Sequence, residues 1–210
     1  MYNLPHFKEH DPQTITQFMQ AHPFAMLIGC SNNLPVATQV PLLLEEREGK
    51  LFFKGHIMRS TDHHKAFEQN PNALCVFTGA HTYVSASWYT HPQTASTWNY
   101  LSVHAKGILR FLPEEQLIQI LSETTSRFEN NTQSPALFKH LPQEYVQRLI
   151  KAIIAFEIEV TDIDHVFKLS QNRDAESYHN IVNKLQEGDA DAQQIASEMQ
   201  NRSAQVFPAK

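Results

Sequence analysis

The densest group of polar side chains in the sequence lies between residues 54 and 65. It begins with Lys54-Gly55-His56, continues through Arg59 and Ser60, and ends at His63-His64-Lys65. This group follows a predicted strand and precedes a predicted helix, so backbone N–H groups, a hydroxyl and cations could converge there on an anion. The sequence contains neither a Gly-x-Gly-x-x-Gly motif nor a Walker motif. The group is therefore either a phosphate site without a P-loop or a solvated charged loop.

Three further stretches combine aromatic rings or hydrogen-bond donors with other polar groups. Both tryptophans lie in Ser85-Ala86-Ser87-Trp88-Tyr89 and Thr97-Trp98-Asn99-Tyr100. Such a mixture suits a planar heteroaromatic ligand, and core aromatics at the end of a barrel are the alternative. Donors also crowd the segment Lys168-Leu169-Ser170-Gln171-Asn172-Arg173, where helix capping is the alternative role.

Metal binding and nucleophilic catalysis find little support in the residue spacing. His6 and His10 are flanked by prolines, and the side chains of the adjacent His63 and His64 diverge. The sequence has no His-Glu-x-x-His or Cys-x-x-Cys motif, so we predict no metal site. Cys30 and Cys75 lie in apolar strands, where thiols are usually inert.

Short strands must position these segments, and helices dominate only after residue 113. The strands are predicted at 24–30, 36–40, 51–53, 74–78, 83–87, 100–112, 154–160 and 164–170. Helices are predicted at 13–21 and 61–70, from Pro113, from about Pro142, and as two closing amphipathic helices separated by Gly188. Strands without βαβ alternation favour an antiparallel barrel with added helices.

Composition narrows the classes of protein further. The chain has 210 residues, 17 Lys plus Arg against 22 Asp plus Glu, and a formal net charge of −5. This balance argues against a basic nucleic-acid-binding protein, so direct DNA binding is doubtful. No signal peptide or membrane-spanning apolar run is visible, and we expect a cytoplasmic protein.

Taken together, the motifs resemble the PaiB family of FMN-binding split-barrel proteins, which are described as negative transcriptional regulators. The most specific block is Thr97-Trp98-Asn99-Tyr100 followed by Val103-His104, and the Lys168–Arg173 segment comes next. Further matches are Ala21-His22-Pro23-Phe24-Ala25, Pro41-Leu42-Leu43-Leu44, Gly55-His56 to Arg59, Phe77-Thr78-Gly79 and Ser87-Trp88-Tyr89. The resemblance covers about residues 1–185. Ala86 and Ala95-Ser96 depart from the family pattern, so the loop before Trp98 is expected to differ.

The resemblance implies a mainly β fold with added helices (α+β), namely a six-stranded antiparallel split β-barrel of the FMN-binding type with a helical C-terminal region. We accordingly expect a split-barrel domain at 1–173, with inserted helices at 113–151. A helical extension at 174–210 would pack on the same domain.

The resemblance also implies a homodimer that binds FMN in a cleft at the subunit interface. His56, Ile57, Arg59 and Ser60 would lie near the FMN phosphate, and Thr38, Gln39, Val40 and Pro41 would line the isoalloxazine ring. The residues that would complete the cleft, from the same chain or from the partner subunit, are Trp98, Asn99, Tyr100, Gln171 and Arg173.

Three functions stay open at the level of sequence. The first is a PaiB-type FMN-binding protein that acts indirectly as a negative transcriptional regulator. The second is a flavin-dependent oxidoreductase of a small substrate, and the third is a haem-binding split-barrel protein. The sequence identifies no catalytic residue, electron donor or acceptor.

Overall fold

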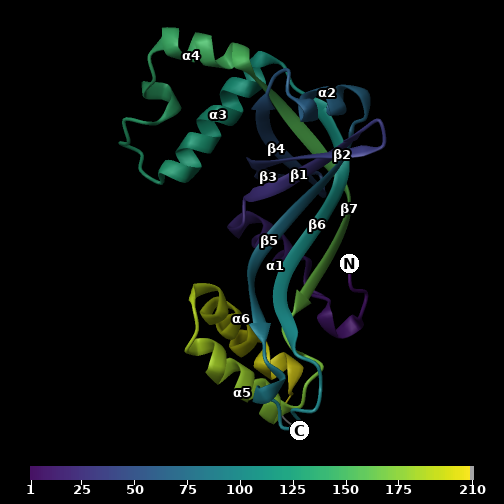
Figure 1. Cartoon of the computed structure of the whole chain (residues 1–210). Coiled ribbons are helices and arrows are strands. Elements are labelled where there is room, and N and C mark those ends of the chain that lie inside the picture. Colours follow the sequence, from purple (N-terminus) through teal and green to yellow (C-terminus); the bar gives the residue numbers. More distant parts are fainter. Residues whose placement is uncertain (209–210) are drawn as a thin grey trace. The chain divides into compact units, whose positions relative to one another are not determined.

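The computed structural model of the chain describes residues 1–208, which form six α-helices and seven β-strands (Figure 1). The helices are α1 (Pro12–Ala21), α2 (Asp62–Gln69), α3 (Glu114–Glu129), α4 (Gln143–Leu149), α5 (Ala175–Gln186) and α6 (Ala190–Val206). The strands are β1 (Phe24–Ser31), β2 (Leu34–Pro41), β3 (Leu43–Arg47), β4 (Lys50–Met58), β5 (Asn72–Val84), β6 (Thr97–Phe111) and β7 (Ile153–Lys168). Short 3₁₀ helices are Pro5–Phe7, Ala86–Trp88, Phe138–His140 and Ile150–Ala152. None of the helices within residues 1–208 is long and apolar enough to cross a membrane.

The seven strands belong to one sheet with the order β2-β1-β5-β6-β7-β4-β3. The β1–β2, β1–β5, β3–β4 and β4–β7 pairs are antiparallel. The predicted class, a mainly antiparallel fold of the split-barrel type with added helices, is confirmed. The sheet nevertheless has seven strands rather than six, and β2 and β3 lie at its two ends instead of closing a barrel.

The additional strand is β3, which the sequence pattern did not reveal. Glu48 and Gly49 both have positive φ, 51° and 74°, and form the two-residue turn that joins β3 to β4. Turns with this geometry match the right-handed twist of a hairpin. The turn therefore converts the charged stretch Glu45-Glu46-Arg47 into an edge strand, where polar side chains are tolerated.

Two predicted breaks between strands are wrong. β5 runs continuously through Gly79, and β7 joins the two strands predicted on either side of residues 161–163. In β7 the polar stretch is held by its neighbour β6, because Thr161 Oγ1 donates to the Lys106 carbonyl and Lys106 Nζ lies 2.9 Å from Asp162 Oδ2. Pairing with an adjacent strand thus outweighs local turn propensity.

The contacts within the chain define two compact units. Unit 1 comprises Met1–Phe18, Thr78–Val103 and the described residues from Asp164 onward, and unit 2 comprises Met19–Phe77 and His104–Ile163. Strands β5, β6 and β7 each contribute residues to both units. The division at residue 173 that the sequence suggested stays a prediction, and the last two residues of its 174–210 extension lie outside the described range.

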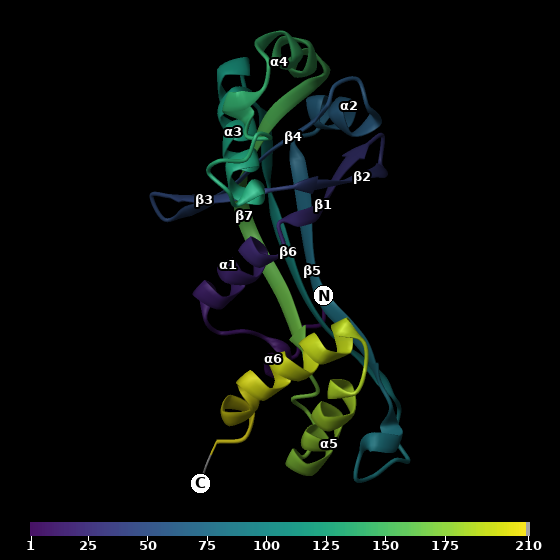
Figure 2. The ribbon, with the colours of Figure 1, turned by 90° about the vertical axis from the view of Figure 1, so that its left-hand side faces the viewer.

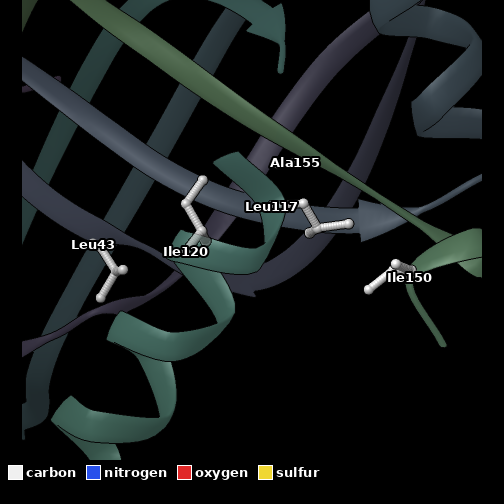
Figure 3. Close-up of a cluster of buried hydrophobic side chains, with 5 residues drawn as sticks. All are labelled: Leu43, Leu117, Ile120, Ile150 and Ala155. Carbon is white, nitrogen blue, oxygen red and sulfur yellow. The ribbon is translucent and has the colours of Figure 1, made fainter. Parts of the chain in front are cut away.

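In unit 2, helix α3 is anchored by an aliphatic cluster (Figure 3). Leu117 and Ile120 come from α3, Leu43 from β3, Ile150 from the 3₁₀ helix before β7, and Ala155 from β7. Figure 3 shows the two α3 side chains projecting from one face of the helix. Full burial of each Leu or Ile contributes about 1.5–3 kcal/mol, so this face rather than helix propensity holds α3 in place.

Helix α2 has the boundaries that its terminal residues predict. The Thr61 hydroxyl caps the first turn by accepting a hydrogen bond from the His64 N–H at 3.4 Å, and Asn70 ends the helix before Pro71. Its buried face, which carries Ala66 and Phe67, lies against β1 and β2 (Figure 2). The turn that joins β4 to α2 is consequently held close to β1 and β2.

In unit 1, the two closing helices that the sequence predicted are α5 and α6, and the structure packs them against each other. Ile181 and Ile195 are fully buried, and the Tyr178 hydroxyl donates to the Met199 carbonyl at 2.8 Å. Asp174 caps α5 and Asp189 caps α6. α5 ends at Gln186, and the Asp189 cap starts α6 directly after Gly188, so the C-terminal region forms two separate helices.

Candidate functional site

The turn between β4 and α2 presents a guanidinium group and a hydroxyl to solvent. The backbone N–H of Arg59 donates to the Ala152 carbonyl at 2.9 Å, and its Nε donates to the Ile153 carbonyl at 3.0 Å. Within residues 1–208, no acceptor occupies the two terminal nitrogens of Arg59. The side chain is thus oriented by the start of β7 while its two strongest donors face outward.

Ser60 continues this turn in a left-handed backbone conformation, with φ of 65°. This conformation is unusual for a residue other than Gly, Asn or Asp. The Ser60 N–H donates to His64 Nδ1 at 3.2 Å, and the exposed Ser60 hydroxyl stays available. Arg59 and Ser60 together therefore form a donor surface suited to an anion.

His56 and Ile57, the remaining residues predicted at this end, point to opposite faces of β4. Ile57 is 3% exposed and belongs to the core, whereas His56 is half-buried. Burial lowers the pKa of His56, which favours the neutral imidazole and leaves it as a hydrogen-bonding group rather than a cation. His56 can thus contact a ligand, whereas Ile57 packs in the hydrophobic core on the opposite face of β4.

The local positive charge is smaller than the sequence suggested. Lys54 forms an ion pair with Glu45 of β3, and the Asp62 carboxylate sits in the first turn of α2. The exposed cations near the turn include Arg59, Lys65 and Lys151, which directly precedes the Ala152 bonded to Arg59. Within the turn itself, Arg59 supplies the positive charge.

Strand β2 carries Thr38, Gln39, Val40 and Pro41 at one end of the sheet order. Gln39 is exposed, Thr38 and Pro41 are half-buried, and Val40 is 6% exposed. A Cβ atom at Gly55 of β4 would lie 2.8 Å from the Phe156 ring and 3.2 Å from the Pro41 carbonyl oxygen, so a larger residue would crowd both neighbours. The structure therefore places the Pro41 end of β2 beside β4 within unit 2.

The other predicted residues belong to unit 1 and have different surroundings. Trp98 is 52% exposed and lies beside the rings of Tyr83 and His81, at centroid distances of 6.0 and 6.1 Å. Asn99 is fully buried, where its amide accepts a hydrogen bond from the Ser170 hydroxyl at 3.0 Å and donates to Met199 Sδ. Tyr100 is half-buried, and burial raises its pKa.

Gln171 and Arg173 also use their side chains within unit 1. The Gln171 amide bonds the backbone of Phe167 and Leu169, and the Arg173 guanidinium lies 4.1 Å from the centroid of the Tyr89 ring. Lys168 of the same segment donates to Thr97 Oγ1 and to the Trp98 carbonyl. The family motifs around residues 97–100 and 168–173 thus bind each other directly.

Two polar residues that the sequence reasoning gave no role stand out in unit 2. His64 is 8% exposed and holds Ser60, and Glu157 is 2% exposed and is held by two arginines. For His64, the Thr61-x-x-His64 spacing is a sequence signal, because Thr61 caps the helix and places His64 in its first turn. No comparable signal exists for Glu157, because its partners come from distant strands.

Neither metal nor thiol chemistry is indicated by the geometry. In the part of the chain that the structure describes, no three His, Cys, Asp or Glu side chains are grouped to hold a metal ion. Burial raises the pKa of the Cys75 thiol to about 12, which keeps it protonated.

Comparison with known proteins identifies the family. The sequence matches the family model described as "Putative FMN-binding domain" over residues 1–162. It is 30% identical over 203 residues to the protease synthase and sporulation protein PAI 2 of Bacillus subtilis (strain 168), a match that covers 96% of this chain and 98% of the relative.

Solved structures with the same fold share little sequence with this chain. The FAD- and haem-binding protein from Mycobacterium smegmatis has a TM-score of 0.57 at 15% identity, covering 76% of this chain and 72% of that one. The flavocytochrome Anf3 from Azotobacter vinelandii has a TM-score of 0.55 at 17% identity, with 76% and 68% covered. These similarities support the fold, and the family match supports FMN as the cofactor. The resemblance is thereby confirmed, and the chain belongs to the PaiB family of FMN-binding domain proteins.

Proposed function

We propose that this chain binds FMN with the phosphate at the Arg59–Ser60 turn and the isoalloxazine ring along β2. The observation that carries the proposal is the oriented Arg59 side chain, whose terminal nitrogens are left unpaired within residues 1–208. A guanidinium beside a hydroxyl is the donor set that a phosphate monoester requires. FMN, when bound, supplies the flavin's redox chemistry.

The isoalloxazine ring would lie along an edge strand, whose free backbone groups can hydrogen-bond the polar atoms at the edge of the ring. β2 stands at the end of the sheet order, so its outer edge offers backbone donors and acceptors that no neighbouring strand occupies. The close approach at Gly55 keeps this edge near the end of β4. In this arrangement Thr38–Pro41 orient the ring, and His56 adds a neutral hydrogen-bonding group.

We also propose that the protein is a homodimer in which a second copy covers an apolar face of unit 2. Met26 and Ile28 of β1 lie opposite Val76 and Leu74 of β5, and Met26 is 41% exposed. A groove of about 480 Å³ continues this face and is also lined by Ile108, which is 43% exposed. Exposed apolar surface of this kind is typical of a protein–protein interface. Trp98, Asn99, Tyr100, Gln171 and Arg173 stay predicted contributors from the partner subunit; of these, Trp98 offers an exposed ring and Asn99 is enclosed.

The test of flavin binding is a titration of the purified protein with FMN and with riboflavin, followed by flavin absorbance and fluorescence. Wild type should bind FMN more tightly than riboflavin, and Arg59→Ala should weaken FMN binding roughly tenfold or more, since it removes charged hydrogen bonds. Riboflavin lacks the phosphate, so its affinity should not change.

The matched control is Arg148→Ala, which removes an exposed arginine from α4 of the same unit. It should leave both affinities unchanged. If wild type does not bind FMN, or if Arg59→Ala binds it as wild type does, the proposed site is wrong. Absence of flavin binding together with a Soret band on haem addition would favour the haem-binding alternative.

A regulatory role, if present, is proposed to be indirect. The chain carries a net charge of −5, which opposes binding to a phosphate backbone. Salt-sensitive, phosphate-driven binding should be absent from gel-shift titrations at ~100 mM salt. Salt-resistant, sequence-specific binding by the pure protein would contradict this proposal. Reoxidation of the reduced, flavin-loaded protein by a small substrate under anaerobic conditions would favour the oxidoreductase alternative.

A further inference from the structure

His64 occupies an unusual place for a polar side chain. It lies in the first turn of α2, is 8% exposed, and its ring is 5.0 Å from the Phe111 ring at an interplanar angle of 58°. Nδ1 accepts the hydrogen bond from the Ser60 N–H, whereas Nε2 is enclosed and has no hydrogen-bond partner within residues 1–208. The Glu68 carboxylate oxygen Oε1 lies 3.8 Å from His64 Nε2.

This hydrogen bond requires the tautomer in which Nδ1 carries no proton. A neutral imidazole carries its proton on one nitrogen only, and the nitrogen that accepts from Ser60 must be unprotonated. His64 therefore acts as an acceptor toward the turn through Nδ1 and carries its proton on Nε2. A protonated ring would have no acceptor to offer to Ser60.

The acceptor matters because the Ser60 backbone is strained. A left-handed conformation is disfavoured for serine and persists only where its surroundings hold it. Here the turn is held on two sides. Arg59 is bonded to the Ala152 and Ile153 carbonyls at the start of β7, and Ser60 is bonded to His64 on α2. Loss of the second contact would remove the side-chain acceptor of the Ser60 N–H, while the bonds of Arg59 and the bond from the Thr61 hydroxyl to the Met58 carbonyl would remain.

We infer that His64 is a positioning residue for recognition of the flavin phosphate, acting through Ser60 without touching the ligand. This inference rests on the proposed function, because it assumes that the Arg59–Ser60 turn binds the phosphate. It adds a residue of α2 that sets the preference for FMN over riboflavin.

Two variants separate the hydrogen bond from the packing of the ring. His64→Phe retains an aromatic ring against Phe111 and removes the acceptor. His64→Asn removes the ring and places Oδ1 where Nδ1 was, at the same number of bonds from Cβ. Affinities for FMN and riboflavin are measured for both variants by fluorescence titration, and thermal unfolding is measured without flavin.

His64→Phe should bind FMN about fivefold more weakly, which is the effect of one hydrogen bond, with riboflavin affinity and thermal stability near those of wild type. His64→Asn should unfold at a lower temperature and yet retain the wild-type ratio of FMN to riboflavin affinity. If the ratio is unchanged in His64→Phe, or falls in both variants together with their unfolding temperatures, the inference is wrong.

The same titrations distinguish failure of the inference from failure of the proposed function. If Arg59→Ala weakens FMN binding and His64→Phe does not, the phosphate site stands and His64 has no positioning role. If wild type itself does not prefer FMN to riboflavin, the proposed phosphate site fails, and the inference fails with it.

Discussion

At the scale of single residues, Glu157 is the most enclosed charge in unit 2. Its side chain is 2% exposed, and its carboxylate accepts hydrogen bonds from Arg47 of β3 and from Nε and Nη2 of Arg110 of β6. Burial of an ionised carboxylate is costly unless such partners are present. Removal of the Glu157 charge should therefore lower the free energy of unfolding by more than removal of a surface ion pair does.

We expect Glu157→Gln to lower the free energy of unfolding by about 2 kcal/mol, because it leaves two guanidinium groups facing a neutral amide. The value lies below the range for fully buried pairs, since the Arg110 side chain is 66% exposed and can rehydrate. Urea denaturation followed by circular dichroism measures the change. Glu159→Gln, which alters the exposed partner of Lys50 two residues along β7, is the control and should have a much smaller effect. Equal effects of the two substitutions would contradict this account of Glu157.

At the scale of elements, helix α5 depends on a charged cap. Asp174 accepts hydrogen bonds from the backbone N–H and the hydroxyl of Ser177, at 2.8 and 2.7 Å, and from Thr90 Oγ1 at 3.2 Å. The Ser177 backbone hydrogen bond is the largest cause, and together these bonds lower the pKa of Asp174 from 3.8 to about 2. The ionised cap thus stabilises the first turn of α5.

This pKa predicts how the cap responds to pH. A group whose pKa is lower in the folded protein contributes stability that is present above about pH 4 and is lost as the pH falls toward 2. Asp174→Asn keeps an acceptor without the titration, so wild type should be more stable at pH 5 and the difference should shrink toward pH 2. Urea midpoints of both proteins across this range give the measurement. A difference that stays constant with pH would mean that the charge of Asp174 does not matter.

At the scale of the whole molecule, the proposed homodimer would bury an apolar face that is exposed in the single chain. Unit 2 leaves Met26 and Ile108 exposed beside an apolar groove, and apolar faces of this kind are covered in most obligate assemblies. A charge placed at the centre of such an interface cannot be hydrated or paired. It should therefore separate the subunits rather than unfold them.

We expect wild type to sediment at twice the chain mass of 24.1 kDa, and Ile108→Glu and Met26→Glu to sediment at the mass of one chain. Sedimentation equilibrium gives these masses. Leu149→Glu, at an exposed apolar position of α4, introduces the same charge elsewhere in unit 2 and should remain dimeric. A wild-type monomer, or dissociation by all three substitutions alike, would contradict the proposed interface.

Local signals in the sequence were sufficient to predict several helix boundaries and the family. Thr61 and Pro71 bound α2, Pro113 and the two carboxylates after it start α3, and Gly188 separates α5 from α6. These signals act within about four residues, where capping and backbone restriction decide the outcome. The multi-residue motifs likewise identified the FMN-binding family, because a motif match depends on residue order and not on tertiary contacts.

The polar groups that are available for chemistry depend instead on tertiary contacts. Lys54 is neutralised by Glu45, Asn99 is enclosed by Ser170 and Met199, and Glu157 is buried although it alternates with apolar residues as an exposed side chain would. Strand pairing also carried β5 through Gly79 and β7 through residues 161–163. The physical reason is common to all of these cases: the deciding partner is supplied by another strand or helix, and its distance along the chain hides it from any local pattern.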